Sequence, residues 1–149
     1  WLRPGLLVLL DDLEARRPAT FDWLLHTEGE VIREAPDTLL IRRGQAAMRL
    51  RFVWPREVVL AVETGPNPYA DPMWGVREWT TIRATPGQPS ARETILAVMS
   101  LARDGADPAV ADVIEDAAGA TIPAAAGPAV RIQTRPELLL RLAAGSARP

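Results

Sequence analysis

A pair of aspartates and the only histidine of the chain are the residues whose types and spacing could support chemistry. Asp11 and Asp12 end the apolar run Leu6–Leu10, and His26 follows Asp11 by fifteen residues. Carboxylate and imidazole groups are common zinc ligands, but a catalytic zinc site needs three protein ligands and a structural site four. The sequence has no second histidine and no cysteine. Asp11 and His26 therefore predict an incomplete metal site unless a carboxylate such as Asp12 or Asp22 joins; the plainer interpretation is a strand-end histidine hydrogen-bonded to an aspartate.

Aromatic residues in and after a proline-rich segment form a second candidate site. Tyr69, the only tyrosine, lies in the segment 65–72, and Trp74 and Trp79 follow it. Indole rings can stack on sugars, and a tyrosine with a histidine can act as base and acid in β-elimination from a uronic acid. A loop tyrosine more often only packs, so we assign no catalytic residue. Carbohydrate binding is the role predicted for Tyr69, Trp74 and Trp79.

Arginines on neighbouring segments suggest a basic face. Arg42, Arg43, Arg49 and Arg51 lie on two consecutive predicted strands, and arginine binds carboxylate or sulfate groups in a bidentate manner. The alternative, which we favour, is that they form the solvated outer face of a sheet.

Alternation of apolar and polar residues indicates strands that present these side chains. It is clearest in the segment 45–54, where Arg49 and Arg51 are predicted to face outward. The predicted core row of that segment is Met48, Leu50, Phe52 and Trp54. The run 6–11 is apolar without alternation, which is typical of a strand buried on both faces. The predicted strands are 6–11, 20–27, 31–32, 38–42, 45–54, 58–62, 76–84, 94–101, 130–134 and 138–142.

These short strands, about ten in number at spacings of roughly 8 to 12 residues, predict an all-β fold, an antiparallel β-sandwich. We expect a turn at 15–18, a long surface loop at 65–72 and a loop at 117–129. The segment 107–118 is compatible with either helix or strand.

Length and composition limit the class of protein. A chain of 149 residues with 48% apolar residues can bury one core, so we expect a single domain over 1–149. Its net charge of −2 provides no overall attraction to nucleic acid. No apolar run reaches the roughly 18 residues of a membrane span. Because the sequence starts at Trp1, without an initiator methionine or secretory signal, we expect a fragment of a longer protein, with a processed chain as the alternative; the resemblance described below implies that the fragment is C-terminal.

The segment PGLLVLLDDLEARRPATFDWLLHT resembles the C-terminal β-sandwich of heparinase II/III-like polysaccharide lyases. In that family an apolar strand ending in aspartate is followed, about fifteen residues later, by a strand ending in Leu-His. The segments DTLLIRRGQAAMRLRFVWP, EWTTIRAT and ETILAVMSLAR are similar to the family in the same order. The resemblance extends to about Arg103.

This resemblance implies that the chain is an accessory part of a lyase that cleaves uronic acid-containing polysaccharides by β-elimination. Its partners would be an N-terminal helical catalytic domain, which it braces, and the acidic polysaccharide. By position, Asp11 and His26 match residues of a metal site, often zinc, which also takes a histidine from an upstream strand. Tyr69 inherits no role, so we expect the chain alone to be inactive.

The resemblance further implies a periplasmic or secreted protein. Two alternatives to the accessory domain stay open at this point. One is a non-catalytic carbohydrate-binding module that uses an exposed aromatic platform and the arginines, and the other is a scaffold domain that keeps the family fold without lyase chemistry.

Overall fold

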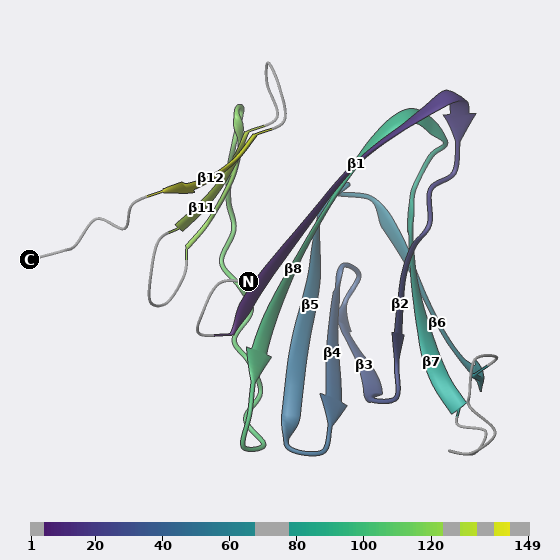
Figure 1. Ribbon diagram of the computed structural model, residues 1–149, viewed down its shortest axis with the longest axis vertical. Coiled ribbons are helices and arrows are strands. Elements are labelled where there is room, and N and C mark those ends of the chain that lie inside the picture. Colours follow the sequence, from purple (N-terminus) through teal and green to yellow (C-terminus); the bar gives the residue numbers. More distant parts are fainter. Residues whose placement is uncertain (1–4, 68–77, 124–128, 134–138, 144–149) are drawn as a thin grey trace, which may run out of the picture.

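A computed structural model describes residues 5–67, 78–123, 129–133 and 139–143 of the chain. The described residues form twelve strands and no helix (Figure 1). In chain order the strands are β1 Leu6–Ala19, β2 Trp23–Thr27, β3 Glu30–Ala35, β4 Thr38–Arg43, β5 Ala46–Trp54, β6 Val58–Pro66, β7 Glu78–Pro86, β8 Ser90–Ala102, β9 Ile114–Asp116, β10 Gly119–Ile122, β11 Ala129–Gln133 and β12 Leu139–Ala143. No helix in this part of the chain is long and apolar enough to cross a bilayer.

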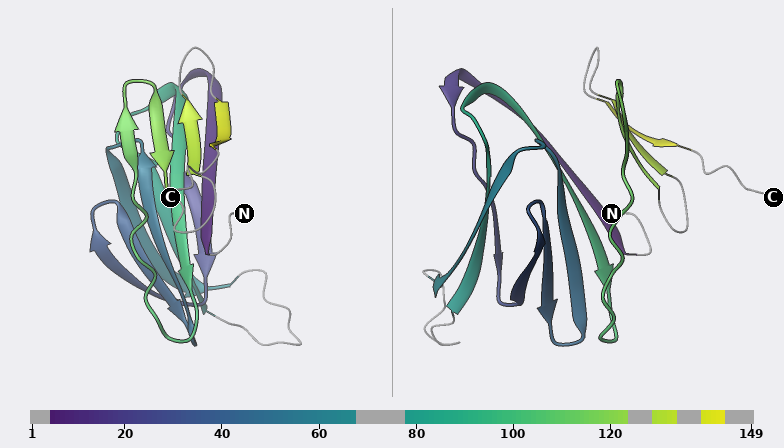
Figure 2. Two further views of the ribbon diagram at one scale, coloured as in Figure 1. Left: turned by 90° about the vertical axis from the view of Figure 1, so that its left-hand side faces the viewer. Right: turned by 180° about the vertical axis from the view of Figure 1, so that it is seen from behind.

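The strands form three sheets in layers. Sheet A has the order β1-β8-β5-β4-β3, sheet B has β2-β7-β6, and sheet C has β12-β11-β10-β9. Every pair of neighbouring strands in them is antiparallel. Sheet A lies between the other two, and sheet C covers β1 and β8 (Figures 1 and 2). The prediction of an all-β antiparallel sandwich is confirmed.

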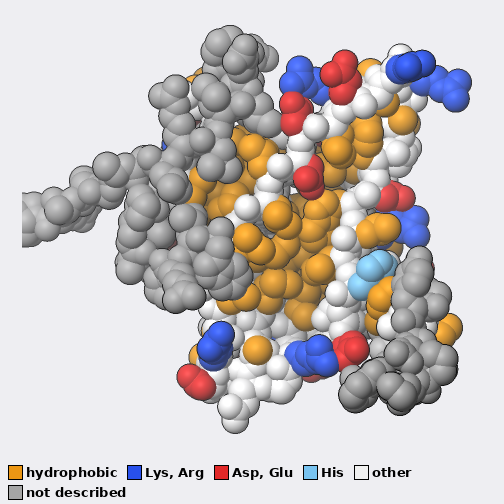
Figure 3. Space-filling view, in the orientation of Figure 1, with side chains coloured by type: hydrophobic (Ala, Val, Ile, Leu, Met, Phe, Trp, Pro, Cys, Tyr) orange, Lys and Arg blue, Asp and Glu red, His pale blue; other side chains and the backbone are white. Residues whose placement is uncertain are grey.

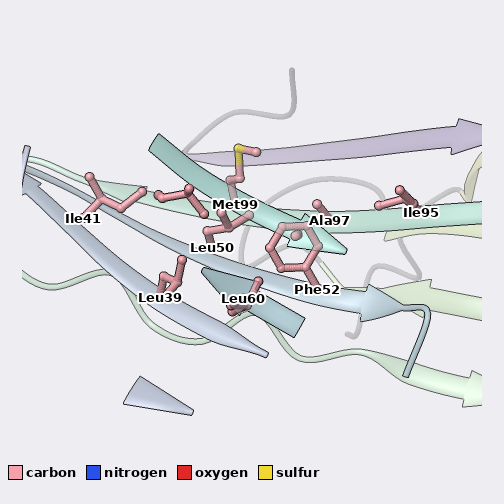
Figure 4. Close-up of a cluster of buried hydrophobic side chains, with 10 residues drawn as sticks. Leu39, Ile41, Leu50, Phe52, Leu60, Ile95, Ala97 and Met99 are labelled. Carbon is pink, nitrogen blue, oxygen red and sulfur yellow. The ribbon is translucent and has the colours of Figure 1, made fainter. Parts of the chain in front are cut away.

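The first core lies between sheets A and B. Leu50 and Phe52 of β5 are 0% and 1% exposed, and Met48 is partly buried against them. Their partners are Leu39, Ile41, Leu60, Ile82, Ala84, Ile95, Ala97 and Met99. Figure 4 shows these side chains gathered between the strands. The predicted inward row of Met48, Leu50 and Phe52 is therefore confirmed.

The second core joins sheet C to the outer face of sheet A. Ile122 and Ile132 of sheet C pack against Leu96 and Val98 of β8. Strand β1 contributes to both cores, because Leu7 and Leu9 pack against the first, and Val8 and Leu10 against the second. The apolar run without alternation thus has the two-sided packing that the sequence predicts.

Trp54 corrects one detail of the predicted core row. The pairing of β5 with β8 shifts register between Phe52 and Trp54, as at a β-bulge. An extra residue in one strand changes which side chains share a face. Trp54 consequently packs against the second core rather than the first.

Several predicted boundaries also differ from the structure. The expected turn at 15–18 lies within β1, which continues to Ala19 through an irregularity after Glu14. The segment 107–118 contains the short strand β9, and the expected loop at 117–129 contains β10. Strand β10 is stabilised by pairing with β11, which lies later in the chain. Such pairing is not visible in the local alanine-rich sequence.

The sandwich of sheets A and B has two edge strands on each side, β3 with β6 and β1 with β2, and neither pair forms a ladder; we call the first side closed because a side chain bridges it, and the second open. On the closed side, Arg33 of β3 donates a 3.3 Å hydrogen bond to the carbonyl oxygen of Leu60 in β6. On the other side β1 and β2 are the edge strands of their sheets, and neither pairs with the other. The apolar inner residues of these edges are therefore only partly covered.

Candidate functional site

Asp11 lies on the inner face of sheet A, in a row of apolar side chains. It is paired in register with Ile95, a member of the first core. Its neighbours in the same row, Leu9 and Leu13, pack against that core. The Asp11 side chain is half-buried, and no described residue forms a hydrogen bond or ion pair with it.

His26 lies on the outer face of sheet B. Its Nδ1 atom is 3.0 Å from the hydroxyl oxygen of Thr81, its register partner in β7. Its ring stacks on Trp79, with the ring centroids 4.2 Å apart and the planes 10° from parallel. The neighbouring residues of β2, Trp23 and Leu25, point the other way, toward the first core.

The structure does not bring Asp11 and His26 together. They lie in different sheets, Asp11 faces the interior of the sandwich, and His26 faces away from it. His26 contacts a threonine rather than an aspartate. This arrangement does not fit a zinc ion shared by the two side chains. Within the described ranges, no group of three or more histidine, cysteine, aspartate or glutamate residues could hold a metal ion.

The two other carboxylates considered as ligands are bound by arginines. Asp12 accepts hydrogen bonds of 3.2 and 2.7 Å from Arg92, which is the main reason that the pKa of Asp12 is lowered. Asp22 accepts hydrogen bonds from Arg83 and from the hydroxyl of Thr85. Both carboxylates therefore have partners on a neighbouring strand.

The predicted aromatic site is described only in part. Trp79 is half-buried, and one face of its indole ring is covered by the imidazole of His26. Tyr69 and Trp74 lie outside the described residues.

The four candidate arginines are each paired with a carboxylate. Arg42 binds Asp107 through two hydrogen bonds, and Arg51 contacts Asp37 at 3.4 Å. Arg43 pairs with Glu28 and Arg49 with Glu34. Arg42, Arg49 and Arg51 thus belong to a charge-paired outer face of sheet A, as the favoured interpretation predicts. Arg43 does not, because it pairs in register with Ala46 and continues the inner row of Leu39 and Ile41.

Sequence reasoning missed these pairs, although a signal for them was present. The acidic partners Glu28, Glu34 and Asp37 lie in or next to β3. Their arginines lie on β4 and β5, the next two strands of the same sheet. Opposite charges on neighbouring strands of one face tend to pair. A basic face inferred from the arginines alone does not take into account the carboxylates that neutralise their charge.

An apolar surface lies on the open side of the sandwich. We call it the open edge and define it by half-buried inner residues of the two edge strands, namely Leu7, Leu9, Asp11 and Leu13 of β1, with Trp23 and Leu25 of β2. Figure 3 shows hydrophobic side chains gathered on the surface between β1 and β2. Large contiguous apolar surfaces of this kind mark sites of interaction with other protein segments.

No known protein family matches the sequence in a scan of family profiles, and a search of curated proteins finds no matching relative.

Proposed function

We propose that the chain is an accessory β-sandwich of the heparinase II/III-like lyase type, which braces a catalytic helical domain of a longer protein. The observation that carries this proposal is the open edge. A bracing domain needs an apolar docking surface, whereas a free-standing sandwich normally covers its edge strands or protects them with charge. The order of the resembling segments supports the lyase class.

In this proposal the chain contributes rigidity and a wall of the substrate cleft rather than the acid or base. The substrate is a uronic acid-containing polysaccharide, which the helical domain cleaves by β-elimination. A periplasmic or secreted location belongs to the same proposal. A bound zinc would require ligands other than the pair of Asp11 and His26, because these two side chains face in different directions.

The test compares three proteins: the longer protein of the proposal, the same protein with this sandwich deleted, and the chain alone. Cleavage of the polysaccharide is followed by the ultraviolet absorbance of unsaturated uronates. We expect product from the longer protein, loss of product when the sandwich is deleted, and none from the chain alone. Product from the chain alone that disappears in Tyr69→Phe would contradict the proposal.

A carbohydrate-binding module is the second candidate, and Trp79 favours it. Its indole belongs to the outer row of β7 in sheet B, which also contains Thr81 and Arg83. The stack with His26 holds the ring in place but leaves at most one face for a sugar. Binding of a uronate oligosaccharide that is lost in Trp79→Ala, together with a longer protein without a helical domain, would favour this function instead.

A further inference from the structure

We propose that the open edge accepts an extended polypeptide strand, whose apolar side chains alternate and whose arginine pairs with Asp11. This inference rests on the docking role proposed above, but not on lyase chemistry. It specifies the chemistry of the partner and the way in which it binds.

The edge strand β1 provides the backbone for such an addition. It is 14 residues long and pairs only with β8, so one row of its backbone N–H and C=O groups has no strand partner among the described residues. Such a row is a template for a further strand, and peptides bind to many sheets in this way. A strand added to β1 would extend sheet A along the open side of the sandwich.

The inner residues of the open edge select apolar side chains at alternate positions. Leu7, Leu9 and Leu13 are half-buried against the first core, as are Trp23 and Leu25 of sheet B. The indole of Trp23 is held by an edge-to-face contact with Phe52, at a centroid distance of 5.1 Å. Every second side chain of an added strand would point into this apolar surface, because the side-chain period of a strand is two.

Asp11 selects the charge of the partner. It is the charged residue in the inner row of β1, between Leu9 and Leu13, and no described residue pairs with it. Covering the row with apolar groups alone would desolvate this carboxylate without compensation, which disfavours binding of a purely apolar strand. An arginine at the facing position would satisfy both carboxylate oxygens. Asp12 is engaged by Arg92, so it does not compete for that arginine.

The competing explanation is that Asp11 protects the edge against pairing. An inward-pointing charge on an edge strand is a known way to prevent association between sheets. In that case, removal of the charge should promote self-association of the chain and should not affect binding of an arginine peptide.

Two synthetic peptides test the proposal on the whole chain. Both alternate valine and threonine; one has arginine at its central inward position and the other glutamate, and binding is measured by calorimetry. We expect the arginine peptide to bind about tenfold more tightly. Asp11→Asn should reduce this preference to less than about twofold. Glu14→Gln, which removes a charge from the opposite face of β1, should preserve it. Circular dichroism checks that each variant folds, and Asp11→Glu, which keeps the charge, should retain the preference.

A second readout distinguishes strand addition from loose apolar binding. Hydrogen exchange should show new protection of β1 amides in the complex, and N-methylation of the peptide backbone should abolish binding. Equal affinity for the two peptides, protection elsewhere, or self-association of Asp11→Asn would overturn the proposal. A dimer of the wild-type chain formed through the open edge would also overturn the proposal. If a helical domain of the longer protein binds while neither peptide does, the strand-addition proposal fails and the bracing function stands. If the arginine peptide binds preferentially and the longer protein has no helical domain, the strand-addition proposal is supported and the bracing function is contradicted.

Discussion

Arg49 shows how a single pair neutralises a charge at the surface of sheet A. Its guanidinium donates hydrogen bonds of 2.6 and 2.7 Å to the two carboxylate oxygens of Glu34. The Arg49 side chain is only 13% exposed, and that of Glu34 is 29% exposed. The hydrogen bond from Arg49 is the main reason that the pKa of Glu34 lies below its ordinary value of 4.5.

We expect Glu34→Gln to lower the free energy of unfolding by about 0.5 to 1 kcal/mol at neutral pH. Because the folded-state pKa of Glu34 is below its unfolded value, the carboxylate stabilises the fold fully above about pH 4.5. This contribution is lost as pH falls through the folded-state pKa, so the difference between wild type and variant should shrink in acid. Urea denaturation at pH 7 and about pH 3 measures it. The exposed Glu63, with no partner in the described chain, provides the control Glu63→Gln; an equal loss there would contradict the prediction.

At the scale of elements, the start of β10 depends on a glycine that the pairing requires. Gly119 has a φ of 148°, and a Cβ atom there would lie 1.8 Å from the carbonyl oxygen of Ile132 on β11. Gly44, between β4 and β5, also has a positive φ of 58°, but a Cβ atom would meet nothing within 4 Å. The two positions therefore separate steric overlap from backbone preference.

We expect Gly119→Ala to cost about 3 kcal/mol or more, because β10 and β11 must separate. Gly44→Ala should lower the free energy of unfolding by only about 1 to 2 kcal/mol, because a residue with a side chain disfavours the left-handed backbone conformation. Denaturation followed by circular dichroism gives both values, and hydrogen exchange should show faster exchange of β10 and β11 in Gly119→Ala alone. Similar costs for the two variants would show that the close approach to Ile132 is relieved without loss of pairing.

At the scale of the whole molecule, sheet C completes the burial of sheet A. Leu96 and Val98 are 0% and 1% exposed because Ile122 and Ile132 cover them. The second core contains residues from both sides of Arg103, where the proposed lyase-like region ends. The described residues after Arg103 are thus packed as part of the same structure.

We expect a chain that ends at Arg103 to keep its β-sheet circular dichroism but to bind a hydrophobic dye and to self-associate. The reason is that deletion exposes the outer row of β1 and β8. Size-exclusion chromatography and dye fluorescence measure the change. Ile132→Ala in the full chain, which should lose about 2 to 5 kcal/mol and stay monomeric, is the matched control. A monomeric truncated chain without dye binding would show that the second core is dispensable.

The sequence by itself determined the all-β class, most of the strands and the inward row of Met48, Leu50 and Phe52. Alternation is a local pattern, and a strand with one buried face must follow it. The apolar run without alternation also predicted the two-sided packing of β1, because a strand between two layers has no solvent-exposed face.

Only the tertiary structure decided the site. The position of Trp54 depends on a bulge against β8, and the partners of Asp11 and His26 depend on which strands became edges. The sequence placed these two residues at the ends of consecutive strands, but consecutive strands need not pair. Here β1 pairs with β8 and β2 with β7, so Asp11 faces the open edge and His26 stacks on Trp79 outside it. Contacts between residues far apart in the chain set these directions, and no local pattern encodes them.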